Sequence, residues 1–305
     1  MTLMRTKIVV NSTAGRGRAG KLLSRLQACL ARLGVEADIV HSGAPGDPTI
    51  LALEAARAGY ERVVAMGGDG TVAEVSNGLL LAAREGHQAV LGIIPAGSGN
   101  DYAYSVGIPT DLEAACERLA NGAMRSADVV RVTADGQTRF FNNTGGIGFD
   151  ADVLFETRKM KRLRGFLLYL GALLRVLASD GRWPYPVSIT VDGRPMPQHA
   201  VTLVSVCNGP RAGGGFYLTP DARPDDGLFD VIVADQLSRL RLASFVIRVM
   251  RGTHVGAKPV TIQRARHVVV EGQRGLPGHI DGEVLCTAGR RIEFEILPGQ
   301  LKVWC

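Results

Sequence analysis

A glycine-rich loop around one carboxylate is the strongest chemical signal in the sequence. Residues 66–71 read Met-Gly-Gly-Asp-Gly-Thr and directly follow a β-branched run. The glycines are Gly67, Gly68 and Gly70. They let the backbone approach a polyphosphate, while Thr71 is placed to cap a following helix. A carboxylate beside phosphates is repulsive unless Mg²⁺ lies between them. The pattern therefore predicts that Asp69, exposed at the strand end, holds a metal ion or a metal-bound water.

Two further glycine loops have the composition of phosphate-contacting loops, at residues 11–20 and 95–101. The first contains both GxGxxG and GxxxxGK, but Leu22 stands where a P-loop needs a hydroxyl for magnesium. The acids Glu36 and Asp38 also come earlier than the acid of a dinucleotide fingerprint. We favour a phosphate-contacting loop of another kind, and a flexible glycine turn is the alternative.

Strands and helices that could position these loops alternate in the first part of the chain. Apolar strand-like runs occur at residues 7–10, 35–40, 62–66 and 90–94, and amphipathic stretches at 21–33, 49–58, 72–84 and 112–119. This alternation predicts a three-layer α/β domain with a mostly parallel sheet. Ligands bind beyond the carboxyl ends of such strands, so the three glycine loops are expected to converge there.

After about residue 125 the alternation stops and strands dominate. Strand-like runs occur at residues 128–133, 138–142, 187–191, 201–208, 229–234, 267–271, 292–297 and 301–304. They predict a β-rich antiparallel sandwich, interrupted by helical regions near 153–179 and 237–250. We therefore predict an α/β domain over residues 1–125 and a β-rich domain over 126–305, whose last strand is free to return toward the domain junction.

Charge and cysteine content exclude several classes of protein. The chain has 35 Lys and Arg against 29 Asp and Glu, and five of the basic residues lie within residues 158–164, with the rest of the chain close to neutral. A nucleic-acid groove is therefore not predicted. The five cysteines are widely separated and show no CxxC, which disfavours a disulfide framework or structural zinc. The cysteine pattern therefore fits a reducing cytoplasm. No apolar run reaches the ~18 residues of a membrane span, so we expect any membrane contact to be peripheral.

The basic run leads directly into an apolar stretch at residues 166–177. One interpretation of residues 158–179 is an amphipathic helix that docks on anionic lipid, giving a peripheral contact at the inner membrane face. The alternative is a core helix with a solvated basic lead-in, since apolar residues fall on nearly every face. The sequence leaves both interpretations open. It also leaves open whether the protein forms a homodimer.

Five motifs in order resemble the diacylglycerol kinase catalytic-domain family of bacterial lipid kinases, relatives of sphingosine and ceramide kinases. They are GGDGT at 67–71, PAGSGND at 95–101, NTGGIGFD at 143–150, GGGF at 213–216 with PDARPDDGLFD at 220–230, and HIDGE at 279–283. The resemblance covers essentially the whole chain, whereas GGDGT alone is shared with NAD kinases. It implies an α/β nucleotide domain, a β-rich lipid-binding domain and an active site in the cleft between them.

The resemblance makes ATP the phosphoryl donor and places its contacts on the strand-end loops. The implied ATP-contacting residues are Asn11, Ser42, Gly67, Gly68, Asp69, Gly70, Thr71, Glu74, Ser98 and Asn100. Asp69, which would hold the phosphates together with Mg²⁺, is also counted as catalytic.

The PDARPDDGLFD segment resembles a magnesium-binding loop of the second domain. The implied ligands are the Asp226 carboxylate and the backbone carbonyls of Arg223 and Leu228. Acids, a glycine turn and carbonyls supply the hard oxygen atoms that Mg²⁺ prefers. A solvated acidic hairpin is the alternative.

The HIDGE segment supplies the candidates for a general base. His279, Asp281 and Glu283 alternate, so their side chains share one face of an extended segment. The resemblance implies that one of the two carboxylates takes the proton of a lipid hydroxyl. We favour Asp281, because Gly282 beside it allows close approach of a substrate. A strand with a solvated polar face is the alternative.

The sequence therefore predicts an ATP- and Mg²⁺-dependent lipid kinase with diacylglycerol as the default acceptor. A sphingoid base remains an alternative, because no motif describes the acceptor pocket. An NAD kinase is disfavoured by the PDARPDDG and HIDGE segments. A non-catalytic nucleotide- or lipid-binding regulator is disfavoured by the four retained acids, Asp69, Asp226, Asp281 and Glu283.

Overall fold

The computed structural model describes residues 4–160, 163, 165–179, 183–197, 199–256 and 258–305. The chain divides into two compact units, the first formed by Met1–Ala127 with Gly299–Cys305 and the second by Asp128–Pro298. It passes between them within two strands, β5 (Met124–Ala134) and β14 (Glu283–Trp304). The terminal segment, which the sequence leaves unplaced, thus belongs to the first unit.

The first unit is built on a parallel sheet. Its strands are β1 (Thr6–Val10), β2 (Ala37–His41), β3 (Arg62–Gly67) and β4 (Val90–Pro95), and the end of β14 pairs with β4. The order is β14–β4–β3–β1–β2, and every pairing is parallel. The apolar β3 and β4 are buried along their whole length, as expected of strands covered by helices on both faces.

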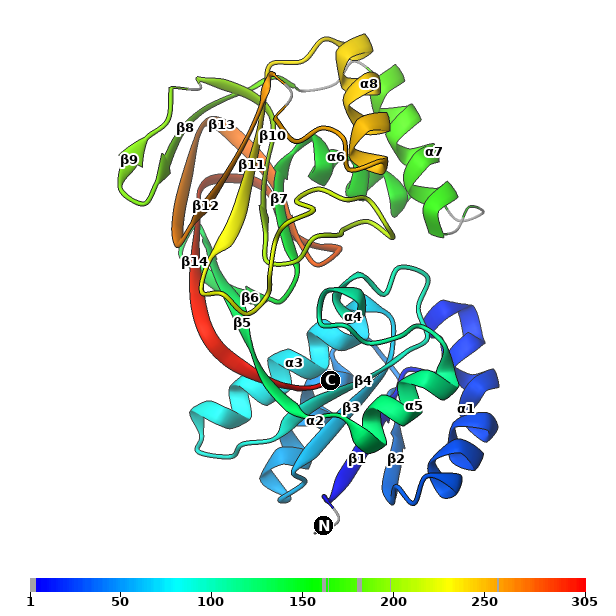
Figure 1. Ribbon diagram of the computed structural model, residues 1–305. Coiled ribbons are helices and arrows are strands. Elements are labelled where there is room, and N and C mark those ends of the chain that lie inside the picture. Colours follow the sequence, from blue (N-terminus) through cyan, green and yellow to red (C-terminus); the bar gives the residue numbers. More distant parts are fainter. Residues whose placement is uncertain (1–3, 161–162, 164, 180–182, 198, 257) are drawn as a thin grey trace. The chain divides into compact units, whose positions relative to one another are not determined.

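Helices cover both faces of this sheet (Figure 1). They are α1 (Ala14–Arg32), α2 (Asp47–Arg57), α3 (Asp69–Arg84), α4 (Asp101–Ser105) and α5 (Leu112–Asn121). On one face α2 packs against α3, and on the other α1 packs against α5. Gly78 makes the α2–α3 approach close, because a Cβ there would lie 2.8 Å from the Cβ of Ala52.

The first glycine loop is shorter than the sequence predicts. Residues 14–20 lie in α1, whereas we expected the helix to begin at Lys21. Gly15 and Gly17 adopt positive φ angles within the first turns, and Ala19 is fully buried. Glycine therefore allows an irregular helix start here, and the buried apolar face of α1 extends back to Ala19.

Side chains of the first unit anchor the chain terminus. The Trp304 indole N–H donates to the Leu119 carbonyl over 2.9 Å, and the Arg62 guanidinium lies 5.2 Å from the Trp304 ring centroid. Arg62 also donates to the same carbonyl, over 2.6 Å. The end of β14 is thus tied to α5 as well as to β4.

The second unit is an antiparallel β structure. Its strands are β6 (Gln137–Phe141), β7 (Thr144–Gly148), β8 (Tyr185–Val191), β9 (Arg194–Pro195), β10 (Ala200–Cys207), β11 (Phe229–Asp235), β12 (Val260–Ala265) and β13 (His267–Ile280), with parts of β5 and β14. The main path is β12–β11–β10–β7–β13–β14, and β8 pairs with both β10 and β13. Buried residues of β5, β7, β8, β10, β11, β13 and β14 form one core, which confirms the predicted sandwich-like class.

Three helices of the second unit share a further core with its strands. They are α6 (Phe149–Thr157), α7 (Gly165–Ala178) and α8 (Arg239–Met250), and Figure 1 shows α7 and α8 side by side. The predicted helical region 153–179 is thus two helices, of which α7 buries Ala172, Leu173 and Val176. Lys161, Arg162 and Arg164 of the basic run lie outside the described residues. Within the described residues, we find no helix with both the length and the apolar character that a membrane span requires.

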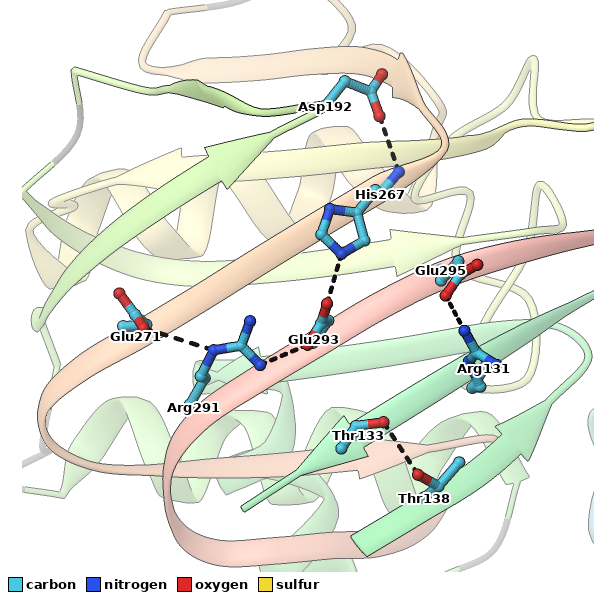
Figure 2. Close-up of polar contacts among 9 residues, drawn as sticks. All are labelled: Arg131, Thr133, Thr138, Asp192, His267, Glu271, Arg291, Glu293 and Glu295. Atoms are coloured by element: carbon cyan, nitrogen blue, oxygen red, sulfur yellow. Dashed lines mark hydrogen bonds and ion pairs between the residues drawn. The ribbon is translucent and has the colours of Figure 1, made fainter. Parts of the chain in front are cut away.

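A network of polar cross-strand pairs covers part of the second unit (Figure 2). Between β13 and β14, His267 bonds to Glu293 over 2.7 Å and Arg291 pairs with Glu271, and Arg291 also pairs with Glu293 on its own strand. Opposite charges facing each other across antiparallel strands stabilise the pairing modestly. These acids already have basic partners, so we do not count them among the candidate site residues.

Candidate active site

The candidate nucleotide-contacting residues of the first unit follow the carboxyl ends of neighbouring parallel strands. Asn11 follows β1, Ser42 follows β2, Gly68 follows β3 and Ser98 follows β4. Backbone hydrogen bonds join successive loops. The N–H groups of Asn11, Ser42 and Ala96 donate to carbonyls of the neighbouring strands over 3.0, 3.0 and 2.7 Å. The structure therefore brings the predicted loops to one edge of the sheet, as the parallel topology requires.

Asp69 is more buried than the sequence predicts. It is partly buried at the start of α3, and its Oδ1 accepts the Tyr102 N–H over 3.0 Å. Burial raises the pKa of Asp69, and N–H bonds from the backbone of residues 100–102 oppose that rise. The main chain of residues 100–102 therefore holds the carboxylate, which is not freely exposed.

Thr71 does not cap its helix, contrary to our expectation. Gly68 is the N-cap of α3, and no side chain caps that end. Thr71 is buried and its hydroxyl accepts a hydrogen bond from the Asn11 side-chain amide over 3.1 Å. The side chains of Asn11 and Thr71 thus connect the loops after β1 and β3.

Two glycines pack the GGDGT loop against the PAGSGND loop. A Cβ on Gly68 would lie 3.1 Å from the Cα of Gly97, and a Cβ on Gly97 would overlap the Cα of Gly68. Asn100 adopts a left-handed conformation with φ of 55°, and its side chain bonds to both the N–H and the carbonyl of Gly97. The contact leaves Ser98 exposed at the tip of the second loop.

Glu74 and Ser42 connect the β2 loop to its neighbours. The Gly46 N–H donates to Glu74 Oε2 over 3.0 Å, and the Thr49 hydroxyl donates to the Glu74 carbonyl over 3.0 Å. The Ser42 hydroxyl donates to the Val10 carbonyl over 3.4 Å. Both candidates therefore lie beside the strand-end loops and help to fix the β2 loop.

The candidate base Asp281 lies in a hairpin turn, where we expected an extended strand. Asp281 and Gly282 join β13 to β14 with φ angles of 44° and 81°, as in a two-residue type I′ turn. His279 pairs in register with Val284, and Ile280 with Glu283. The argument that three alternating residues share one face is therefore wrong, because the chain reverses between them.

Both oxygen atoms of the Asp281 carboxylate accept backbone hydrogen bonds. Oδ2 accepts the Asn142 N–H over 2.9 Å, and Oδ1 accepts the N–H groups of Asn143 and Thr144 over 3.1 and 2.8 Å. Glu283 differs, since its Oε2 pairs with the partly exposed guanidinium of Arg139 and its side chain is 42% exposed. Of the two candidates, Asp281 has both carboxylate oxygens bonded to main-chain amides, whereas the bond given for Glu283 engages Oε2 alone.

The candidate magnesium ligands lie in an acidic turn. Asp226 Oδ1 accepts the Leu228 N–H over 3.1 Å, and its other oxygen pairs with Arg264. The Gly227 N–H donates to the Asp128 carboxylate over 2.7 Å. Burial, together with the negative charges of Asp226 and Asp221, raises the pKa of Asp230 to about 6, and Arg264 opposes this rise.

These acids fit a divalent cation in charge and in donor chemistry. Asp226 pairs with Arg264, and Asp226 and Asp221 are close enough to Asp230 to raise its pKa. Asp128 accepts the N–H of Gly227, the residue after Asp226. The described residues contain no cluster of three or more side-chain ligands of the kind that holds a metal by itself. A cation here would thus depend on backbone carbonyls, such as those of Arg223 and Leu228, in addition to a carboxylate.

Sequence reasoning missed a buried polar cluster beside the HIDGE hairpin. Asp150 accepts a hydrogen bond from Ser205, and its Oδ2 lies 3.5 Å from His279 Nε2. A Cβ on Gly146 would overlap the Asp150 carboxylate, so glycine makes room for the cluster. The signal that could have found it is Asp150 itself, the last residue of the NTGGIGFD motif.

Two family descriptions match the chain. Residues 5–132 match the diacylglycerol kinase catalytic domain. Residues 144–305 match the YegS C-terminal NAD kinase beta sandwich-like domain.

Curated relatives match over most of their length. A diacylglycerol kinase of Mycobacterium tuberculosis is 32% identical over 297 residues, which are 97% of this chain and 93% of the relative. A diacylglycerol kinase of Bacillus subtilis is 32% identical over 92% of this chain and 90% of the relative. A probable YegS-like lipid kinase of Pseudomonas aeruginosa is 34% identical over 85% of this chain and 81% of the relative.

Solved structures share the fold. A putative diacylglycerol kinase from Bacillus anthracis superposes with a TM-score of 0.80 at 24% identity, covering 100% of this chain and 98% of that one. An NAD kinase from Archaeoglobus fulgidus in complex with ATP gives a TM-score of 0.55 at 13% identity, covering 99% of this chain and 94% of that one. At these identities both comparisons show similarity of fold alone.

Proposed function

Because the chain belongs to the diacylglycerol kinase catalytic-domain family of bacterial lipid kinases, we propose that it transfers the γ-phosphoryl group of ATP to the hydroxyl of a lipid alcohol. Diacylglycerol is the default acceptor, and it is named in the relatives from Mycobacterium tuberculosis and Bacillus subtilis. The observation that carries the proposal is the close packing of the GGDGT and PAGSGND loops, Gly68 against Gly97, at the strand ends.

The strand-end loops are the proposed site for the ATP phosphates. Glycine at residues 67, 68 and 70 keeps side chains away from the backbone, so amide groups can approach phosphate oxygens. The partial positive charge at the start of α3 favours the same anion. Asn11, Thr71 and Asn100 hold the loops in place through the side-chain bonds described above.

We propose two roles for Mg²⁺, one in each unit. Asp69 would hold the ion that accompanies ATP, and this ion would neutralise charge on the transferred phosphoryl group. Asp226 and the carbonyls of Arg223 and Leu228 would hold a structural ion, for which the surrounding acids supply the charge. In the second unit Arg264 would have to share Asp226 with that ion.

Glu283 is the general base that the geometry favours, in place of our sequence-based choice of Asp281. A base needs an oxygen that can reach the proton of the acceptor hydroxyl. Three amide donors already engage the Asp281 carboxylate, whereas Glu283 is partly exposed and bonded on one oxygen to Arg139. Asp281 then serves to hold the hairpin on residues 142–144, which places Glu283.

The direct test uses purified protein, γ-labelled ATP and either a total lipid extract or NAD. We expect a labelled lipid whose mass exceeds that of its acceptor by one phosphoryl group, and no labelled NAD phosphate. Identification of the product by mass spectrometry would also separate diacylglycerol from a sphingoid base. Labelled NAD phosphate without any labelled lipid would overturn the proposal.

A further inference from the structure

The second unit carries a hollow of about 430 Å³ between α8 and the segment that leads into β12. Its described lining combines cationic and apolar side chains, and none of these lining residues is a carboxylate. The lining residues are Leu237, Arg241, Ser244, Phe245, Arg248, Lys258, Pro259 and Val260. Arg241, Ser244 and Arg248 recur at helical spacing, so they form one stripe along α8. The hollow is thus a cationic pocket with an apolar floor.

The cationic side chains of this pocket are not used in ion pairs with the described residues. Within the part of the chain that the structure describes, no carboxylate pairs with Arg241, Arg248 or Lys258. The sequence explains why, because residues 236–270 contain seven Lys and Arg and no Asp or Glu. This surplus exceeds the net charge of +6 of the whole chain. These basic residues are spread over many positions, so no single basic run marks the surplus in the sequence.

Large apolar side chains lie exposed next to the cationic stripe. On α8, Leu240 is 86% exposed and Ile247 is 51% exposed, one residue before Arg241 and Arg248 respectively. On the adjacent α7, Leu167 and Leu174 are 61% and 57% exposed. The two helices share one core, and Arg239 at the start of α8 donates to the carbonyl of Ser179 just after α7. The helix α8 therefore exposes cationic and apolar side chains next to each other, and the adjacent α7 exposes two further leucines.

We infer that this exposed surface of α7 and α8 docks on an anionic phospholipid bilayer, with a lipid phosphate in the pocket of Arg241, Arg248 and Lys258. A cationic pocket beside exposed leucine and isoleucine matches a phosphate head group beside acyl chains. A soluble anion would use the charges but leave the apolar side chains in water. The inference rests on the proposed function, since a lipid kinase must reach an acceptor that resides in a membrane.

The test measures sedimentation of the full chain with vesicles, without ATP. Neutral vesicles consist of phosphatidylcholine alone. Anionic vesicles contain phosphatidylglycerol in addition. The triple variant Arg241→Gln, Arg248→Gln, Lys258→Gln removes the pocket charges. The matched control Arg118→Gln, Arg125→Gln, Arg194→Gln removes three exposed charges elsewhere. Both variants alter exposed residues, so equal melting temperatures of parent and variants show that folding is retained.

We expect the pocket variant to bind anionic vesicles on the order of a hundredfold more weakly at low salt, as about 1 kcal/mol for each cation near an anionic surface implies. The control should bind like the parent. Leu240→Ser with Ile247→Ser should weaken binding at low and high salt alike, because the apolar contribution is not screened. Equal loss in both triple variants, no loss in either, or no preference of the parent for anionic vesicles would overturn the inference.

A separate assay keeps this inference distinct from the proposed function. Turnover of the parent is measured with the lipid acceptor dispersed in neutral detergent micelles, where no anionic bilayer is present. Turnover there, together with charge-independent vesicle binding, overturns the docking surface and leaves the lipid kinase intact. Absence of lipid turnover in micelles and in vesicles overturns the proposed function, whatever the vesicle binding.

Discussion

Oδ1 of Asp69 accepts the backbone N–H of Tyr102 over 3.0 Å, and this bond joins two residues that are 33 positions apart. It attaches the GGDGT loop to the start of α4, directly after the PAGSGND loop. Burial raises the pKa of Asp69, whereas the amide groups of residues 100–102 favour its charged form. The main chain thus fixes a carboxylate that burial alone would tend to neutralise.

Two substitutions of Asp69 should distinguish the effect of losing its negative charge from the effect of losing its hydrogen bond to Tyr102. Asp69→Asn keeps an oxygen for the Tyr102 N–H but removes the charge that would hold Mg²⁺. We expect turnover of ATP to fall about 10²- to 10³-fold, a typical loss for one electrostatic group, with an unchanged or higher melting temperature. Asp69→Ala, which also loses the bond to Tyr102, should melt lower than Asp69→Asn. Near-parent turnover of Asp69→Asn would refute the assigned role.

The close approach of the two glycine loops gives a second expectation. Gly97→Ala places a Cβ too close to the Cα of Gly68, so one of the two loops must move. We expect the free energy of unfolding to drop by about 1–3 kcal/mol, as for other overpacked sites. Gly70→Ala is the matched control, because a Cβ there meets nothing within 4 Å. Urea denaturation of both variants checks this, and equal stabilities would contradict the close contact.

The sequence predicts the first unit well because its elements are local. Each apolar run of β1, β3 and β4 and each amphipathic helix is visible within a short window, and parallel strands leave their loops at one edge. The predicted start of α1, at Lys21, was wrong, because glycines at residues 15, 17 and 20 suggested a loop. In the structure, burial of Ala19 outweighs the weak helix propensity of these glycines.

In the second unit the errors concern the HIDGE hairpin. We predicted an extended strand there, although Asp-Gly favours a two-residue type I′ turn, and the pairing of Ile280 with Glu283 shows the reversal. The three amide donors to Asp281 come from residues 142–144, which no local pattern connects to residue 281. The choice between two adjacent acids therefore needs the fold.

Magnesium should stabilise the second unit through Asp226. If the ion binds only the folded chain, Mg²⁺ at a hundredfold its Kd adds about 2.7 kcal/mol to the free energy of unfolding. We expect the melting temperature of the parent to rise with Mg²⁺, and Asp226→Asn to abolish that rise. Asp225→Asn is the matched control, since Asp225 lies 3.4 Å from Arg223 and is 42% exposed. An equal rise in the parent and Asp226→Asn would place the ion elsewhere.

Acid should weaken the link between α6 and α7. Glu156 bonds to Lys159 and Arg175, each over 2.9 Å, and these bonds lower the pKa of Glu156 below its ordinary value of 4.5. The stabilisation is therefore fully present above pH 4.5 and is lost as the pH falls through the lowered pKa. Both partners are largely exposed, so the contribution is at most about 1 kcal/mol. Glu156→Gln should flatten this part of the stability profile in acid unfolding curves, and an unchanged profile would contradict the assignment.

The two acids of the HIDGE hairpin should separate chemistry from structure. Glu283→Gln removes a base without disturbing the turn, so kcat should fall by about 10²- to 10⁴-fold while the melting temperature and ATP affinity change little. Asp281→Asn keeps the left-handed conformation, which asparagine tolerates, but its single carbonyl oxygen cannot serve all three amide donors. It should therefore lose about 1–3 kcal/mol of stability, the cost of unsatisfied buried groups, with a smaller loss of kcat. Steady-state kinetics and thermal unfolding of both variants decide between these roles. A large loss of kcat in Asp281→Asn at parent-like stability, with near-normal turnover of Glu283→Gln, would return the base to Asp281.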